Sequence, residues 1–164
     1  MNFMAYSDAP QTVRNFLSYL INIKGKSEKT IHEYYYDLRT FFRFMKCKYS
    51  LAPFDKFDNI DCSDITVDFI KLITVDDIYE FLMFVNSERS NTAASRARKV
   101  SSLKSFFNYL SAKAHVLDVN ITKELDSPKL AAKLPVYLTL DESVKLDSVK
   151  NIDSTKVESF DGIK

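Results

Sequence analysis

The sequence predicts an all-α fold, a bundle of about four main helices. Its 164 residues include only two glycines and four prolines, which are the residues that most often interrupt helices and form turns. Thirteen phenylalanines and nine tyrosines supply large side chains for the interior of such a bundle. Apolar residues also recur at spacings of three and four along several segments, which is the period of an amphipathic helix.

The first two predicted helices lie on either side of Gly25. The first is expected to start near residues 7–8, with Pro10 in its first turn, and to end before Gly25. The second opens at Ser27, a favourable N-cap, and runs to about Cys47. The apolar stripes of the two helices are Val13, Phe16, Leu17 and Leu20, and then Ile31, Tyr34, Leu38, Phe41, Phe42 and Met45.

Residues 48–73 form a long acidic connection, which we expect to pack as an extended flap or to hold a short helix. Thr74 and Asp77 then have the spacing of a capping box, with Asp in place of the usual Glu. This spacing predicts the start of a third helix. Its inward residues are Ile78, Phe81, Leu82 and Val85.

The most informative segment is a fourth predicted helix over residues 89–113, starting at Asn91 or Thr92. One face is apolar and consists of Ala93, Ala97, Val100, Leu103, Phe107 and Leu110. The opposite face consists of Ser95, Arg98, Lys99, Ser102 and Ser105. That face has cations and small hydroxyls but no carboxylate, whereas an ordinary solvated face mixes both signs. Such a face can enter a DNA major groove, with cations on phosphates and small side chains near base edges.

The formal net charge of +1 conceals a segregation of charge along the chain. Residues 24–48 have seven cations against three acids, and residues 87–115 have six cations against one acid. Residues 51–85, between them, have eight acids against two lysines. A polyanion responds to the local potential and not to the net charge. We therefore expect the acidic segment to face away from any bound DNA.

The sequence divides into three parts. Residues 1–126 are predicted to form the helical domain, and the proline-bracketed basic segment over 127–138 reads as an interdomain linker. Residues 139–164 are expected to be the poorly ordered start of a truncated second domain.

Several classes of protein are disfavoured. The apolar runs are too short to span a membrane, and the N-terminus lacks the pattern of a secretory signal. Cys47 and Cys62 lack metal-ligand spacing, and we expect them to be reduced thiols of a cytoplasmic protein. No phosphate-binding loop and no pair of catalytic groups supports a self-contained enzyme.

The order of these motifs resembles the N-terminal core-binding domain of bacterial tyrosine recombinases, the Xer and phage-integrase family. The resemblance covers roughly residues 10–147. It rests on Ser27, Thr30, Tyr34, Asp37, Leu38 and Phe41, on Thr74, Asp77, Ile78, Phe81 and Leu82, on Arg96, Lys99, Leu103, Phe106, Phe107 and Leu110, and on Ser127, Pro128, Lys129, Lys133, Pro135 and Leu138.

The resemblance implies a SAM-like bundle that binds one side of a DNA duplex, at a recombination half-site, while a C-terminal catalytic domain grips the other side. It implies a complete enzyme that acts as a tetramer of recombinase protomers without a metal or cofactor, and a fragment that is monomeric. Arg98 is the last arginine of the chain, and neither His32 nor His115 is followed three residues later by arginine, as the family's catalytic motif requires. We therefore expect this chain alone to bind DNA and not to cut it.

Carried over to this chain, the DNA-facing positions of the family lie at the starts of the second and fourth helices and in the linker. Helix N-termini attract phosphates through their free N–H groups and the helix dipole. The candidate residues are Lys29, Thr30, His32, Glu33 and Tyr36, then Asn91, Thr92, Ser95, Arg96, Arg98, Lys99 and Ser102, and finally Lys129 and Lys133.

Plainer interpretations remain open for many of these residues. Ser27, Asn91 and Thr92 can serve only as N-caps, and Arg96 can form an internal salt bridge with the acidic segment. His32 can be a neutral surface histidine, and Lys129 and Lys133 can be solvated linker lysines. For the whole chain, the alternative is a helical protein-interaction module that does not bind DNA. Clustering of Lys29, Arg98 and Lys99 on one exposed surface favours DNA, and about five phosphate contacts predict a log–log salt slope of about −5.

Overall fold

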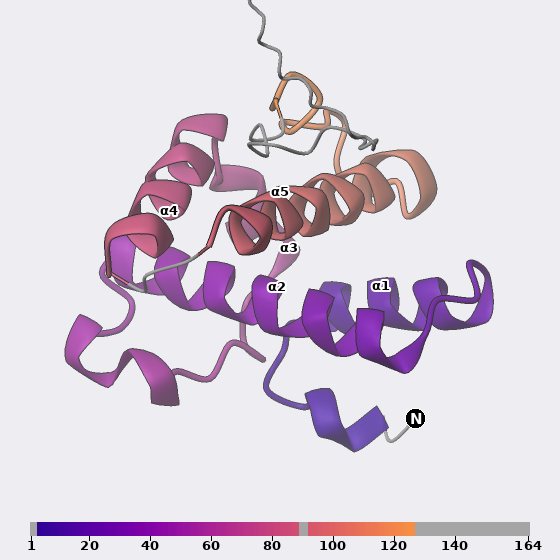
Figure 1. Cartoon of the computed structure of the whole chain (residues 1–164), viewed down its shortest axis with the longest axis horizontal. Helices are drawn as coiled ribbons and strands as arrows, with labels where there is room; N and C mark the ends of the chain where they lie inside the picture. Colours follow the sequence, from indigo (N-terminus) through magenta and orange to yellow (C-terminus); the bar gives the residue numbers. More distant parts are fainter. Residues whose placement is uncertain (1–2, 89–91, 127–164) are drawn as a thin grey trace, which may run out of the picture. The chain divides into compact units, whose positions relative to one another are not determined.

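The structure, a computed structural model, describes residues 3–88 and 92–126. Within these ranges the chain is helical and contains no β-strand, which confirms the predicted fold class. The elements are η1 (Phe3–Tyr6), α1 (Gln11–Asn22), α2 (Glu28–Lys48), η2 (Phe54–Asn59), α3 (Val67–Leu72), α4 (Val75–Glu88), α5 (Ala93–Asn108) and the π-helical turn η3 (Tyr109–Lys113) (Figure 1). Asn91, Lys129, Lys133, the predicted linker and residues 139–164 lie outside the described residues.

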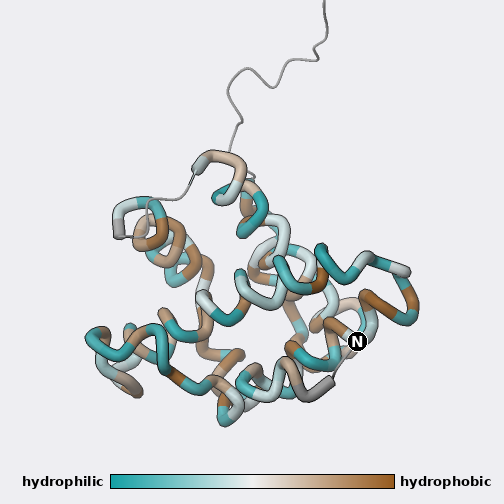
Figure 2. The backbone as a smooth tube through the Cα atoms, turned by 60° about the horizontal axis from the view of Figure 1, so that its bottom comes forward, coloured by the Kyte–Doolittle hydropathy of each residue, from teal (hydrophilic) through white to brown (hydrophobic). Residues whose placement is uncertain are grey.

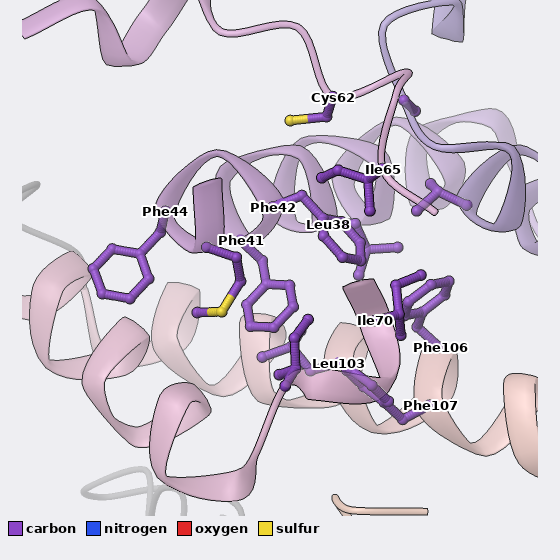
Figure 3. Close-up of a cluster of buried hydrophobic side chains, with 14 of the residues drawn as sticks. Leu38, Phe41, Phe42, Phe44, Cys62, Ile65, Ile70, Leu103, Phe106 and Phe107 are labelled. Atoms are coloured by element: carbon purple, nitrogen blue, oxygen red, sulfur yellow. The ribbon is translucent and has the colours of Figure 1, made fainter. Parts of the chain in front are cut away.

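Helix α2 is the central element of the bundle. In Figure 1 it crosses the middle of the molecule, with α5 above it and η1 below it. Phe106 of α5 meets Phe42 of α2 edge to face at 5.8 Å between ring centroids, and meets Phe16 of α1 at 5.5 Å. Figure 3 shows this core, where phenylalanines of α2 lie opposite Leu103 and the two phenylalanines of α5. Such aromatic pairs add about 0.5–1.5 kcal/mol each beyond the burial of their area.

The predicted apolar stripes form this core. All four stripe residues of α1 are buried, and those of α2 are buried except Tyr34, which is half-buried against the core. On α4, Leu82 is half-buried and the other three are buried. In Figure 2, apolar and polar residues alternate along each helix, as amphipathic helices around a shared core require.

Short-range capping bonds start three of the helices as predicted. Ser27 and Thr92 each accept a hydrogen bond from the backbone N–H three residues on, at 3.3 and 3.1 Å. At α4 the capping box is reciprocal: the Asp77 N–H donates to Thr74 Oγ1 at 3.2 Å, and the Thr74 N–H donates to Asp77 Oδ2 at 3.0 Å. Each cap satisfies N–H groups that a helix start leaves without intrahelical partners.

Helix α1 begins at Gln11, later than predicted, because Asp8 serves another purpose. Its carboxylate accepts a hydrogen bond from the Tyr35 hydroxyl, and its Oδ2 lies 3.8 Å from Nη1 of Arg39 and 3.7 Å from Nη2 of Arg43. These three partners lie on one face of α2. Asp8 therefore pins the N-terminal segment to α2 and does not cap α1.

The acidic connection forms both a flap and short helices. It contains η2 and α3, and its buried residues are Phe57, Ile60, Cys62, Ile65, Ile70 and Ile73. Arg43 donates to the Ile60 carbonyl at 2.9 Å, and Lys46 Nζ donates to Asp64 Oδ1 at 2.8 Å. The connection therefore covers the C-terminal half of α2, whose residues 41–47 are buried on all sides.

Candidate nucleic-acid interface

The candidate residues on α2 (Lys29, Thr30, His32, Glu33 and Tyr36) lie along its N-terminal half and form a surface that we call the ridge. Lys29 and His32 are exposed, and 48% of the Tyr36 surface is accessible. Glu33 and Thr30 are half-buried beside them. The ridge lies away from the acidic connection, which covers the other half of the same helix (Figure 1).

The aromatic residues of this ridge are held in place by their neighbours. The His32 ring stacks on Tyr36 at 6.3 Å between centroids, and its Nδ1 lies 3.2 Å from the Tyr6 hydroxyl. The Arg39 guanidinium lies 4.8 Å over the Tyr36 ring. His32 is therefore an oriented side chain and not an isolated one. Sequence reasoning missed Arg39, although its spacing of three from Tyr36 places both on one side of a helix.

On α5, the structure changes the predicted polar face. Arg98 keeps 35% of its side chain exposed and Ser95 is half-buried, but Lys99 is only 8% exposed and Ser102 is fully buried. The prediction that Lys99 and Ser102 lie on an open face is therefore wrong. The exposed side of α5 instead presents residues such as Ala94 and Ser101.

The physical reason is Asp37 of α2, a carboxylate only 3% exposed that lies against this face of α5. Arg98 donates to it twice, from Nε at 3.0 Å and from Nη2 at 2.8 Å. The Ser102 hydroxyl donates at 2.8 Å, and Lys99 Nζ lies 3.7 Å from Oδ1. Glu33 Oε2 lies 3.8 Å from Nη1 of Arg98. The hydrogen bonds to Asp37 raise the pKa of the Arg98 guanidinium above its usual value, so it stays charged.

We call these five residues (Glu33, Asp37, Arg98, Lys99 and Ser102) the Asp37 cluster. Its contacts bring the N-terminal halves of α2 and α5 together, so that the ridge of α2 and the start of α5 share one surface. At that start, Thr92 is exposed and its hydroxyl donates to Ser95 Oγ at 3.1 Å. We call the exposed and half-exposed part of this region the α2–α5 surface; its residues are Lys29, His32, Glu33, Tyr36, Thr92, Ser95 and Arg98.

Arg96 lies at the contact between α5 and α4. Its Nη1 donates to Asn86 Oδ1 in the last turns of α4, at 2.9 Å. This bond ties the start of α5 to α4. The partner of Arg96 in this bond is the neutral amide of Asn86, whereas the alternative interpretation of the sequence was a salt bridge between Arg96 and the acidic connection.

Many cations of the two basic segments are paired inside the fold. Arg39 and Arg43 lie near Asp8, Lys46 pairs with Asp64 at 2.8 Å, and Lys48 lies 3.4 Å from Asp77 and 3.2 Å from Glu80. In contrast, the lysines around the start of α2 are exposed and form no ion pair with a described residue; these are Lys24, Lys26 and Lys29. The free positive charge of this region therefore lies at the N-terminal end of the ridge.

Comparison with known proteins identifies this arrangement of helices. The family described as phage integrase, N-terminal SAM-like domain, matches residues 13–72, which include α2 and the acidic connection. Residues 13–72 carry the SAM-like domain of the phage integrases. The SAM-like fold predicted from the sequence is thereby confirmed.

Relatives of this SAM-like domain are bacterial tyrosine recombinases. Tyrosine recombinase XerC of Caldanaerobacter subterraneus subsp. tengcongensis is 48% identical over 147 residues, which are 89% of this chain and 42% of that protein. XerC of Herpetosiphon aurantiacus is 31% identical over 83% of this chain and 39% of that protein. Tyrosine recombinase XerD of Listeria innocua is 31% identical over 82% of this chain and 39% of that protein. The chain thus spans about two fifths of the length of these relatives. No solved structure gave a significant match.

Two further properties of the SAM-like domain bear on its setting. Within residues 3–88 and 92–126, no helix has the length and apolar character needed to cross a bilayer. Both cysteines are buried free thiols, and burial raises the pKa of Cys62 to about 12. That thiol is therefore protonated and unreactive at neutral pH.

Proposed function

We propose that this chain binds duplex DNA through the α2–α5 surface, as the DNA-binding domain of a site-specific tyrosine recombinase. The observation that carries the proposal is the convergence of two helix N-terminal halves on one surface, joined where Arg98 contacts Glu33 and Asp37. Free N–H groups at helix starts and nearby lysines are the groups that bind phosphates. The relatives are tyrosine recombinases, which supports the same class of function.

The phosphate contacts belong to the three exposed lysines and to the two helix starts. Lys24, Lys26 and Lys29 surround the start of α2, and Thr92 lies at the start of α5. Lys129, Lys133 and Asn91, outside the described residues, are proposed to add phosphate contacts where the chain continues along the duplex. These contacts position the domain but do not select a sequence.

Sequence readout is assigned to the ridge and to the exposed start of α5. Glu33 can accept from the N4 amino group of cytosine, and His32 and Ser95 offer short polar groups to base edges. Tyr36, oriented by His32 and Arg39, presents an exposed ring to the groove. A wrong base opposite one such contact costs about 1–3 kcal/mol.

The ion pairs of the fold limit the number of cations in the helical bundle that can contact phosphates. Lys24, Lys26 and Lys29, at about 0.9 per phosphate, contribute about −2.7 to the slope, and the proposed contacts of Lys129 and Lys133 bring it to about −4.5. Between about 50 and 200 mM salt, the contribution of the three described lysines alone corresponds to a loss of about 40-fold in affinity. Binding by this chain alone is therefore weak and dependent on salt.

In the complete recombinase, the domain seats one half-site of the recombination target for the catalytic domain. The chain itself is a monomer that does not break DNA, and recombinase protomers assemble on two sites through the complete protein. The reaction takes place in the cytoplasm, and the chain's own contacts to DNA use no metal or cofactor.

Fluorescence anisotropy with a short mixed-sequence duplex, from about 50 to 200 mM salt, tests this proposal. The test variant is Lys24→Ala, Lys29→Ala, and the matched control is Lys56→Ala, Lys71→Ala, which removes the same charge from exposed positions on the acidic connection. We expect the test variant to lower the magnitude of the slope by about 1.8 and the control to leave it unchanged. Equal effects of the two variants on the slope contradict DNA binding by the α2–α5 surface. A folded wild-type chain that does not bind DNA at low salt supports the protein-interaction alternative.

A further inference from the structure

Asp37 is one of two buried carboxylates within the described residues, and the two have different surroundings. Asp77 is 5% exposed, and its partners include Thr74, at the start of its own helix, and the Tyr49 hydroxyl at 2.6 Å. Asp37 lies in the middle of α2 and is 3% exposed. The hydrogen bonds to its carboxylate come from Arg98 and Ser102 of α5, so its charge joins two helices.

The Asp37 cluster carries no net charge. Its two carboxylates, Glu33 and Asp37, balance its two cations, Arg98 and Lys99. Each of the three guanidinium nitrogens of Arg98 lies within 4 Å of a carboxylate oxygen of this cluster: Nε and Nη2 face Asp37, and Nη1 faces Glu33. A cation so occupied adds little positive potential for a phosphate outside the protein.

The cluster also fixes geometry. A guanidinium and a carboxylate joined by two parallel hydrogen bonds hold both distance and direction. Glu33 and Asp37 lie one turn apart on α2, and Arg98 and Ser102 lie one turn apart on α5. Successive turns of both helices are therefore tied, which sets the register of α2 against α5. Apolar contacts alone tolerate small sliding of one helix over another, whereas this pattern of bonds does not.

We propose that Asp37 is a positioning residue for DNA recognition. It holds the N-terminal halves of α2 and α5 at the separation that one duplex requires, and Arg98, Lys99 and Ser102 act through it and do not neutralise phosphates. The inference rests on the proposed function and adds the device that organises the α2–α5 surface. Its specific consequence is that loss of the cluster lowers affinity at every salt concentration and leaves the salt slope unchanged.

The test compares Asp37→Asn with Asp77→Asn in DNA binding by the full chain. Both substitutions remove one buried carboxylate charge with little change in volume, but Asp77 lies outside the α2–α5 surface. Anisotropy is measured at a temperature at which circular dichroism shows all proteins folded. We expect Asp37→Asn to weaken binding about tenfold, a size typical of coupling between sites, with an unchanged slope. Asp77→Asn is expected to bind as the wild type does. Equal weakening by both variants overturns the proposal.

Arg98 distinguishes positioning from phosphate contact. Arg98→Lys keeps the positive charge but loses the two-pronged bond to Asp37, so we expect it to weaken binding nearly as much as Arg98→Gln, with the wild-type slope in both. Rescue by Arg98→Lys, or a slope lowered by about 0.9 in Arg98→Gln, shows instead that Arg98 contacts a phosphate. If the charge variants do not fold, Ser102→Ala replaces them in the test, because it removes one hydroxyl and no charge. Wild-type DNA binding by folded Ser102→Ala contradicts the proposal.

The two proposals fail in different ways. A wild-type chain that does not bind DNA overturns the proposed function and this inference with it. A wild-type chain that binds with the expected slope, while Asp37→Asn binds equally well, overturns only the positioning role.

Discussion

Replacing Arg98 with methionine should destabilise the domain by breaking a buried ion pair. The substitution removes two of the hydrogen bonds to the Asp37 carboxylate, at 3.0 and 2.8 Å. That carboxylate is only 3% exposed in the wild-type structure, so water cannot easily replace the lost bonds. Removing one partner of a buried pair costs about 3–5 kcal/mol. Because 35% of the Arg98 side chain is exposed, water partly screens the pair. We therefore expect a loss of about 3 kcal/mol, the lower end of that range.

Urea unfolding followed by circular dichroism measures this loss. With a slope of about 1.5 kcal/mol per molar urea, the midpoint falls by about 2 M. The double variant Asp37→Leu, Arg98→Met removes both charges and leaves apolar side chains in contact. We expect it to recover stability to within about 1 kcal/mol of the wild type, the remaining loss coming from the contacts that Ser102, Lys99 and Glu33 made to the removed groups.

Two results refute this reasoning. A loss below about 1 kcal/mol in Arg98→Met means that the pair behaves as a surface salt bridge. A double variant that is less stable than Arg98→Met means that Ser102 and Lys99, and not Arg98, provide most of the stabilisation of Asp37.

Three other predictions concern the helix starts and the ridge. Thr74→Ala removes the N-cap of α4 and should lower the unfolding free energy by about 1 kcal/mol in urea titrations; an unchanged midpoint contradicts the cap. Burial raises the pKa of Asp77, but hydrogen bonds from Tyr49, Thr74 and Lys48 outweigh it, so the net pKa is lowered. Its stabilisation is therefore complete above about pH 4 and lost as the pH falls further, so the stability difference from Asp77→Asn should shrink in acid, and a constant difference excludes this linkage. Lys29→Ala should lower the magnitude of the salt slope of DNA binding by about 0.9 in anisotropy titrations, and an unchanged slope removes Lys29 from the phosphate contacts.

The features that could be predicted from the sequence are those encoded within a few residues. The caps at Ser27, Thr74 and Thr92 follow from side chains that bond a backbone N–H three residues on. The apolar stripes follow from the helical period, which does not depend on the partner helix. These local signals were enough to give the fold class and the order of the main helices.

The features that could not be predicted depend on residues far apart in the chain. On a helical projection of α5, Lys99 and Ser102 lie on a polar face that looks exposed. They are buried because that face packs against Asp37 of α2, which lies 61 residues before Arg98 in the chain. Asp8 likewise finds partners on α2 and not at the start of α1. Periodicity places a charged residue on a face, but it does not reveal which other element supplies a countercharge there.

The most direct test of the central claim is an amide NMR titration of the labelled chain with a short duplex at low salt. We predict that the largest shift changes fall on residues 28–40 of α2 and 93–101 of α5, with small changes on α3 and α4. Changes concentrated on α3, α4 or the acidic connection, with residues 28–40 unaffected, would contradict DNA binding by the α2–α5 surface.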